Sequence, residues 1–246
     1  MKIVFKKKHL VLLSLTGLLY RVNFNRENVD RIRKELEPYN ARLVAVSKTK
    51  PSESIRELYD YGQRAFGENY VQELLEKQSE LPADLEWHFI GHLQSNKVKQ
   101  ISPFVSLIHG VDSLKLLVEI NKQAIKENRI QDCLLQIFIA TEETKFGLSF
   151  EEAREILISP SLQTLNNLKI KGFMGMASFS DDEQKVRKEF RSLRTFFEER
   201  KSINNAPCVS LDILSMGMTG DYLLALEEGS TMVRIGSAIF GERTVS

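Results

Sequence analysis

From residue 40 onward, short apolar runs alternate with longer segments in which apolar residues recur at helical spacing. Eight such runs occur, and no linker rich in proline, glycine or serine interrupts them. The predicted strands cover residues 42–47, 64–68, 86–91, 106–111, 133–140, 168–176, 211–217 and 231–236. This alternation predicts an α/β fold with parallel strands, namely a single-domain (β/α)8 TIM barrel. No G-x-G-x-x-G turn opens the first unit, which disfavours an open dinucleotide-binding sheet.

Helices are predicted between the strands from capping and periodicity. Ser113 is a plausible cap for the segment 113–128. In segment 182–203, apolar residues recur at i, i+4, i+7 and i+11 from Val186, which predicts one face packed against a sheet. An extra N-terminal helix is predicted over residues 22–37, where Pro38 stops it.

The first 21 residues resemble a secretory signal, with a basic start and an apolar run. Thr16 and Gly17 interrupt that run, and no small-residue cleavage site follows it. We therefore expect residues 1–21 to be an extension in front of a domain spanning residues 22–246. We also expect a cytoplasmic protein without a cleaved leader.

Composition gives little indication of a macromolecular partner. The 246 residues carry 34 Lys and Arg against 33 Asp and Glu, so neither nucleic acid nor membrane binding is predicted. Cys133 and Cys208 lack metal-ligand spacing and are expected to be buried thiols in a reducing compartment. His88 and His92 are four residues apart, but Gly91 and the strand-like context argue against a shared helix face. No metal site is predicted.

Lys48 ends the first predicted strand in the stretch LVAVSKTKP. Because side chains alternate along a strand, Lys48 shares one side with Val44 and Val46. If the valines line the barrel interior, Lys48 points into its mouth, where partial withdrawal from water favours a nucleophilic amine. The alternative is an ordinary lysine that reaches solvent at the strand end.

Two further segments follow the last two predicted strands. Gly217 and Thr219 lie in a turn that leads into a helix, where a hydroxyl and free N–H groups suit a phosphate. An ordinary threonine cap, with Asp221 in the first turn, is the alternative. Arg234 lies inside an apolar strand and precedes Gly236 and Ser237. A lysine for an aldehyde, N–H groups for a phosphate and an arginine for a ring nitrogen together suggest a pyridoxal 5'-phosphate (PLP) site.

The segments LVAVSKTKP, FGENYVQE, EWHFIGHLQSNK, LSMGMTGD and GSTMVRIGSAIFGER resemble the signature motifs of the pyridoxal phosphate homeostasis proteins, over about residues 22–243. The resemblance implies a barrel like the N-terminal domain of alanine racemase, with Lys48 in a Schiff base to PLP. It places Arg234 at the pyridine nitrogen and Asn69 near the ring. The resemblance also implies that the phosphate is held by two segments, which contain Met216, Gly217, Met218, Thr219, Gly236 and Ser237.

The chain departs from the family pattern at His92 and in the segment TKFG around Lys145. Lys145 could assist loading or release of the cofactor, or it could be a solvated loop lysine. An arginine opposite the pyridine nitrogen leaves that nitrogen unprotonated, which makes PLP a poor electron sink, although two-base racemases tolerate this arrangement. In the racemase fold, a tyrosine from a second domain supplies the opposing base, whereas only five residues follow Gly241 in this sequence.

The resulting hypothesis is a monomeric, non-catalytic PLP-binding protein of vitamin B6 homeostasis, with PLP-dependent apo-enzymes as possible partners. A PLP-dependent amino-acid racemase of low activity is the first alternative. A Schiff-base aldolase acting on a phosphorylated sugar without a cofactor is the second.

Overall fold

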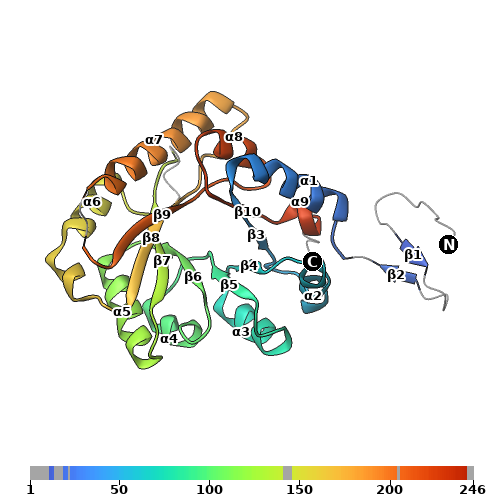
Figure 1. Ribbon diagram of the computed structural model, residues 1–246, viewed down its shortest axis with the longest axis horizontal. Coiled ribbons are helices and arrows are strands. Elements are labelled where there is room, and N and C mark those ends of the chain that lie inside the picture. The colour runs from blue at the N-terminus through green and yellow to red at the C-terminus, as the bar shows by residue number, and fades with distance from the viewer. Residues whose placement is uncertain (1–10, 14–18, 22, 141–145, 204–205, 243–246) are drawn as a thin grey trace.

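A computed structural model describes residues 11–13, 19–21, 23–140, 146–203 and 206–242 of the chain. Eight parallel strands close a barrel in the order β10-β3-β4-β5-β6-β7-β8-β9 (Figure 1). The strands are β3 (Arg42–Val46), β4 (Ala65–Glu68), β5 (Glu86–Phe89), β6 (Leu107–Val111), β7 (Gln131–Ile137), β8 (Leu168–Gly175), β9 (Val209–Ser215) and β10 (Met232–Ile235). Each coincides with a predicted strand, so the predicted (β/α)8 barrel is confirmed.

Helices lie around the outside of the strands (Figure 1). The α-helices are α1 (Arg26–Leu36), α2 (Ser52–Asp60), α3 (Val71–Glu80), α4 (Val98–Ile101), α5 (Leu114–Lys126), α6 (Phe150–Ile158), α7 (Glu183–Lys201), α8 (Tyr222–Glu227) and α9 (Ser237–Phe240). Short 3-10 turns cover Glu37–Tyr39, Ser95–Lys97 and Pro160–Thr164. The side chain of Ser113 caps α5 by accepting the N–H of Leu116, as predicted.

The predicted N-terminal helix is α1, which begins after Asn25 rather than at residue 22. The side chain of Asn25 accepts the N–H of Asn28, and this cap fixes the start of the helix. At the other end, Pro38 falls in the 3-10 turn that follows the helix.

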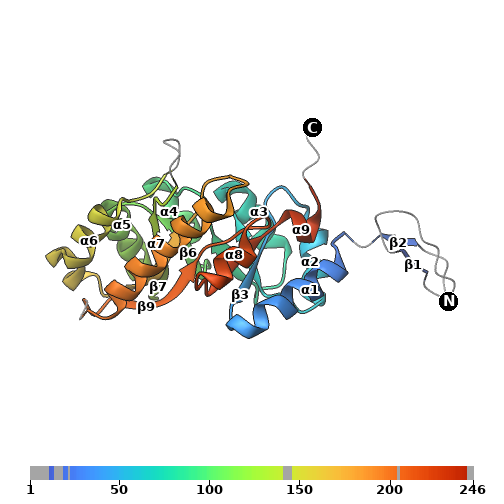
Figure 2. The ribbon, with the colours of Figure 1, turned by 90° about the horizontal axis from the view of Figure 1, so that it is seen from above.

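Part of the predicted extension forms a separate pair of strands. Strands β1 (Val11–Leu13) and β2 (Leu19–Arg21) pair antiparallel and stand apart from the barrel in two perpendicular views (Figures 1 and 2). Among the described residues, no helix is both long and apolar enough to span a membrane.

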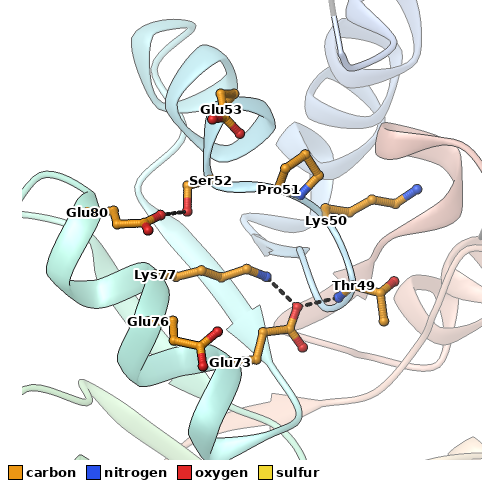
Figure 3. Close-up of a pocket in the computed structure, with 9 residues that line it drawn as sticks. All are labelled: Thr49, Lys50, Pro51, Ser52, Glu53, Glu73, Glu76, Lys77 and Glu80. Atoms are coloured by element: carbon orange, nitrogen blue, oxygen red, sulfur yellow. Dashed lines mark hydrogen bonds and ion pairs between the residues drawn. The ribbon is translucent and has the colours of Figure 1, made fainter.

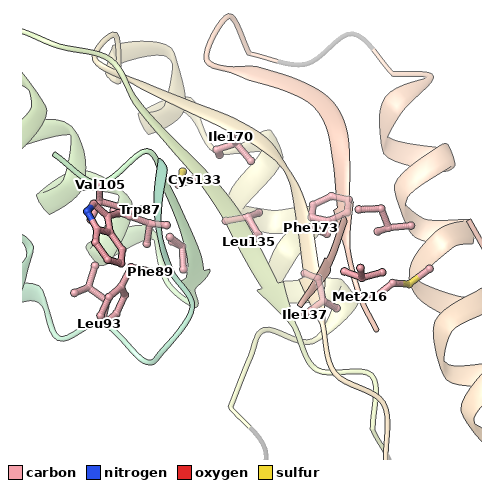
Figure 4. Packing of buried hydrophobic residues seen from close by; sticks show 14 of the residues in the cluster. Trp87, Phe89, Leu93, Val105, Cys133, Leu135, Ile137, Ile170, Phe173 and Met216 are labelled. Carbon is pink, nitrogen blue, oxygen red and sulfur yellow. The ribbon is translucent and has the colours of Figure 1, made fainter. Parts of the chain in front are cut away.

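Two apolar clusters show which side of each strand faces the helices. The larger cluster fills the space between strands and helices, and Figure 4 shows part of it around Trp87, Phe89, Leu135 and Phe173. The smaller cluster takes one residue from each of six barrel strands, namely Val44, Ala65, Leu107, Leu134, Met174 and Met232. Since these residues alternate with those of the larger cluster, they form a layer inside the barrel.

Polar residues occur among the next inward-facing positions. His109 lies two residues beyond Leu107, and Arg234 two residues beyond Met232, so both face inward above the apolar layer. Lys48 lies four residues beyond Val44 and follows the same alternation to the rim. The barrel interior therefore changes from apolar to polar towards the carboxyl ends of its strands, where (β/α)8 proteins carry their functional sites.

Candidate functional site

The predicted site residues gather on four neighbouring strands of the rim. Lys48 follows β3 and Asn69 follows β4, while segment 216–219 follows β9 and segment 236–237 follows β10. In the barrel these strands stand in the order β9, β10, β3, β4. All are parallel, so their carboxyl ends share one arc of the mouth. Lys48 and Asn69 are both partly exposed there.

Two glycines bring the backbone of this arc close together. Gly217 has a φ of +96°, and a Cβ at this position would lie 2.7 Å from the Cβ of Ala225. A Cβ on Gly236 would lie 3.1 Å from the carbonyl oxygen of Val46, at the end of the neighbouring strand. Both positions therefore favour the absence of a side chain, which lets segment 216–219 pack closely on α8 and segment 236–237 pack closely on the end of β3.

The turn after β9 differs in detail from the prediction. Helix α8 begins at Tyr222, with Asp221 at its N-cap position, so Thr219 does not cap the helix. The N–H of Met218 donates to Oδ1 of Asp221 at 2.6 Å and is already engaged. Met216 is fully buried in the larger cluster; its N–H donates to the carbonyl oxygen of Met232 at 3.1 Å, and its carbonyl oxygen accepts from Oγ of Ser230 at 2.7 Å. The amides of Thr219 and Gly220 make no backbone hydrogen bond within the described part of the chain.

On the other side of the arc, segment 236–237 opens helix α9. The N–H groups of Ser237 and Ala238 fall in the first turn, where a helix leaves its amides without an internal acceptor. Ser237 is exposed. The two rim segments together carry these amides and two hydroxyls, those of Thr219 and Ser237.

Arg234 lies beneath this rim and is 4% exposed. Its Nη1 donates to the carbonyl oxygen of Ser215 at 2.8 Å and to Oγ of Ser215 at 2.7 Å. Its Nη2 donates to the carbonyl oxygen of Gly175 at 3.1 Å. Burial lowers the pKa of Arg234 to about 10, so the guanidinium stays charged at neutral pH. Nε takes no part in these three hydrogen bonds.

A chain of hydrogen bonds continues from Arg234 across the barrel. Oγ of Ser215 lies 3.1 Å from Nδ1 of His109, and Nε2 of His109 lies 3.0 Å from Nδ1 of His88. Because arginine only donates, Ser215 accepts from it, and its own proton finds an acceptor at Nδ1 of His109. His109 then carries its proton on Nε2 and donates to His88. This assignment gives each contact of the chain one donor and one acceptor.

Both histidines are held in the neutral form. Burial, with a smaller contribution from the positive charge of Arg42, lowers the pKa of His88 to about 3. Burial, together with His88 and Arg234, lowers the pKa of His109 well below its ordinary value. Their neutrality preserves the hydrogen-bond order, since a doubly protonated His109 would direct a donor at Ser215. The sequence analysis missed both roles, although the position of His109 in an apolar strand was a usable signal.

A second network, which the sequence analysis also missed, lies outside the barrel wall. Lys77 of α3 donates from Nζ to Oε1 of Glu68 and to Oε1 of Glu73, both at 2.7 Å. It also donates to the carbonyl oxygen of Ser47 at 2.8 Å. Oγ of Ser47 donates to Oε1 of Glu68 at 2.6 Å. This network lies directly behind the turn that carries Lys48.

The remaining predicted residues lie away from this arc. His92 is exposed, and its ring stacks on that of Phe146. Its Nδ1 lies 3.3 Å from Oδ2 of Asp112, so His92 is separate from the buried His88. Cys133 and Cys208 are buried free thiols, as predicted. Within the described ranges, no three His, Cys, Asp or Glu side chains are placed to hold a metal ion. Lys145 lies outside the described residues.

Comparisons with known proteins agree with this geometry. A sequence model of the alanine racemase N-terminal domain matches residues 24–244. The structure is similar to that of an alanine racemase from Clostridium difficile 630, with a TM-score of 0.69 at 15% identity over 90% of this chain and 57% of that one. At that identity the likeness concerns the fold alone. Fold and site thus place the protein in the class of alanine racemase N-terminal-like barrels.

Other relatives define the family within that class. The chain is 44% identical over 221 residues to the pyridoxal phosphate homeostasis protein of Aquifex aeolicus (strain VF5), covering 87% of this chain and 95% of that protein. It is 40% identical over 231 residues to the Homo sapiens protein of the same name, covering 90% and 83%. The chain belongs to the pyridoxal phosphate homeostasis protein family.

A solved relative carries the cofactor. PipY of Synechococcus elongatus PCC7942 has been solved with PLP bound, and it matches this structure with a TM-score of 0.78 at 37% identity over 87% of this chain and 99% of that one. The structure of PipY without PLP matches with a TM-score of 0.81 at 38% identity and the same coverage.

Proposed function

We propose that this protein binds PLP at the barrel mouth, holds it on Lys48, and serves as a carrier in cytoplasmic vitamin B6 homeostasis without catalytic turnover. The observation that carries the proposal is the placement of Lys48 on one arc of the rim with two ligand-accessible backbone segments, above the buried Arg234. The family membership and the PLP-bound relative support the choice of ligand.

The residues of the arc fit the parts of PLP. PLP supplies an aldehyde, which condenses with a primary amine to form a Schiff base and release water. Lys48 is the amine on the rim. The amides of Thr219, Gly220, Ser237 and Ala238 suit a phosphate. Met218 contributes to this site without its N–H, which Asp221 occupies.

Arg234 is the residue that disfavours catalysis. Its Nη1 is committed to Ser215 and one N–H of Nη2 to Gly175, so the Nε N–H and the second N–H of Nη2 are the donors that it can offer a ring nitrogen. An arginine that keeps its proton donates to that nitrogen without protonating it. Carbanion formation next to the ring gains little stabilisation under those conditions, and this favours a carrier over a racemase. Asn69, at the end of β4, is placed to contact the face or edge of the ring.

The carrier proposal includes hand-over of PLP to PLP-dependent apo-enzymes by a monomeric protein. The partial exposure of Lys48 supports this, because water and an acceptor amine can reach the bond that holds the cofactor. The proposed domain spans residues 22–246, preceded by the extension of residues 1–21.

The test is the absorbance spectrum of protein incubated with PLP, followed by borohydride reduction and peptide mapping. We expect a yellow protein with the reduced label on Lys48, and loss of the colour in Lys48→Ala. Lys99→Ala, which removes an exposed lysine of α4, is the matched control and stays coloured. A fully coloured Lys48→Ala variant would show that another amine holds PLP.

Two outcomes would favour the alternative functions. Racemisation of single L-amino acids at catalytic rates by the PLP-loaded protein would refute the carrier role. A colourless protein that takes up no PLP, and is trapped by borohydride only with a sugar phosphate, would indicate a Schiff-base aldolase.

A further inference from the structure

The turn that carries Lys48 contains a backbone conformation that its residue type disfavours. Thr49 has a φ of +65°, in the left-handed region. A β-branched residue is rarely found there, because its Cβ substituents crowd the backbone. Such strain persists only where surrounding contacts enforce it, and it concentrates at functional sites. Lys48 immediately precedes this residue, so the conformation of Thr49 helps to set the course of the turn.

Contacts from α3 hold both neighbours of Lys48. The N–H of Thr49 donates to Oε1 of Glu73 at 2.5 Å. The carbonyl oxygen of Ser47 accepts from Nζ of Lys77 at 2.8 Å, and Lys77 also binds Oε1 of Glu73 at 2.7 Å. One carboxylate oxygen of Glu73 therefore joins the strained residue to a buried ammonium group (Figure 3).

The far side of the turn is fixed as well. The N–H of Lys50 donates to the carbonyl oxygen of Ser47 at 3.0 Å, which closes the turn around Lys48. Nζ of Lys50 donates to the carbonyl oxygens of Phe240 and Gly241 at 3.1 and 3.2 Å, at the end of α9. These contacts fix the carbonyl oxygen of Ser47 and both the N–H and the Nζ of Lys50. The hydrogen bond from the N–H of Thr49 to Glu73 acts on Thr49 itself and opposes relaxation of its φ.

This contact borders a surface hollow of about 520 Å³ between the start of α2 and helix α3. Figure 3 shows Glu73 turned from α3 towards Thr49, whereas Glu76, one position before Lys77, points away from the turn. Both glutamates line the hollow, but only Glu73 reaches the backbone next to Lys48. The pair offers a substitution and a matched control on one helix.

We propose that Glu73 is a positioning residue that keeps Thr49 in the left-handed conformation and thereby directs Lys48 into the barrel mouth. Lys77 holds the carboxylate of Glu73 in place for this role, and both side chains contact the backbone of the turn. The proposal rests on the proposed function only in its ligand, since it needs Lys48 to be the amine that takes up PLP.

The first test compares PLP affinity in Glu73→Leu, Glu76→Leu and the double variant Thr49→Asn with Glu73→Leu. We expect Glu73→Leu to weaken PLP binding about tenfold, the scale of one strained residue. Glu76→Leu binds like the wild type. Asparagine accepts the left-handed region, so the double variant regains binding to within about threefold of the wild type. General damage to α3 would not be repaired by a substitution in the turn.

A second measurement needs no cofactor. Hydrogen exchange of the apo-protein is expected to speed up in peptides covering residues 47–51 in Glu73→Leu, and to return towards wild-type rates in the double variant. Unchanged exchange and unchanged PLP affinity in Glu73→Leu would overturn the proposal, as would a double variant as defective as the single one. If the wild type forms no bond to PLP at Lys48, the proposed function fails. The exchange result still decides whether Glu73 holds Thr49 in its left-handed conformation.

Discussion

The polar chain inside the barrel and the charged network outside its wall use burial in opposite ways. Inside, Arg234 is the charged group of the chain, and the histidines beyond Ser215 are held neutral by burial. Outside, one ammonium group, that of Lys77, lies between the carboxylates of Glu68 and Glu73. The side chains of the inner chain are therefore held by hydrogen bonds of one defined direction, whereas those of the outer network are held by attraction between opposite charges.

This difference matches what each network supports. The inner chain ends at the guanidinium of Arg234, which offers N–H donors to a ligand in the proposed site. The hydrogen-bond partners of this guanidinium are neutral, so they do not cancel its positive charge. The outer network holds backbone groups of Ser47 and Thr49 and the hydroxyl of Ser47, on either side of Lys48, and its opposite charges at 2.7 Å give these groups a firm anchor. The two networks together fix the two side chains that the proposed PLP site requires.

The largest effect is expected from Lys77→Met. The side chain of Glu68 is 0% exposed, so the variant leaves a buried carboxylate without its ammonium partner. Breaking a buried pair in this way costs about 3–5 kcal/mol of unfolding free energy. Urea unfolding of the apo-protein measures the loss, and Lys115→Met, on the exposed face of α5, is the control. A loss below about 1 kcal/mol would mean that water or protonation replaces Lys77.

The second-largest effect is expected from acid, which should lower the free energy of unfolding through His88 of the inner chain. The folded-state pKa of His88 is about 3, below the ordinary value of 6.5, so the unfolded chain takes up the proton first. The stability that neutral His88 contributes is present above about pH 6.5 and is lost as the pH falls towards 3. At pH 5 this loss is about 2 kcal/mol for one histidine. Urea unfolding from pH 7.5 to 5 measures it, and the difference between wild type and His88→Phe isolates His88.

Glu68 responds with the opposite sign. Burial raises its pKa despite the opposing effect of Lys77, so the folded protein binds the proton before the unfolded chain does. Its contribution to stability therefore rises as the pH falls through that raised value. A flat difference between wild type and His88→Phe would show that His88 is not held neutral.

The sequence predicted the barrel and the strand ends that carry the candidate site, because both depend on regular patterns. Alternation along β3 predicts Lys48 on the side of Val44, and the apolar context of Arg234 marked it as a buried cation. The order of the strands around the barrel then brings both residues to one arc.

The two networks escaped prediction because their members come from elements that no periodicity relates. Lys77 shares the buried face of α3 with Leu74, and a lysine at such a position was a readable signal of a buried partner. Which carboxylate it meets depends on how α3 lies against β4, and that is a property of tertiary packing. The left-handed φ of Thr49 was unpredictable for the same reason, since local preference disfavours it.

The smallest effect is expected from Arg42→Met, which tests whether burial or distance makes the outer network strong. Arg42 and Glu86 form an ion pair at 2.7 Å, the distance between Lys77 and Glu68, but their side chains are 54% and 43% exposed. Water already solvates both charges, so the expected loss is only about 0.2–1 kcal/mol in urea unfolding. If Arg42→Met costs as much as Lys77→Met, short distance rather than burial determines the strength of these pairs. A several-fold difference would leave burial as the property that makes Lys77 an anchor for the turn around Lys48.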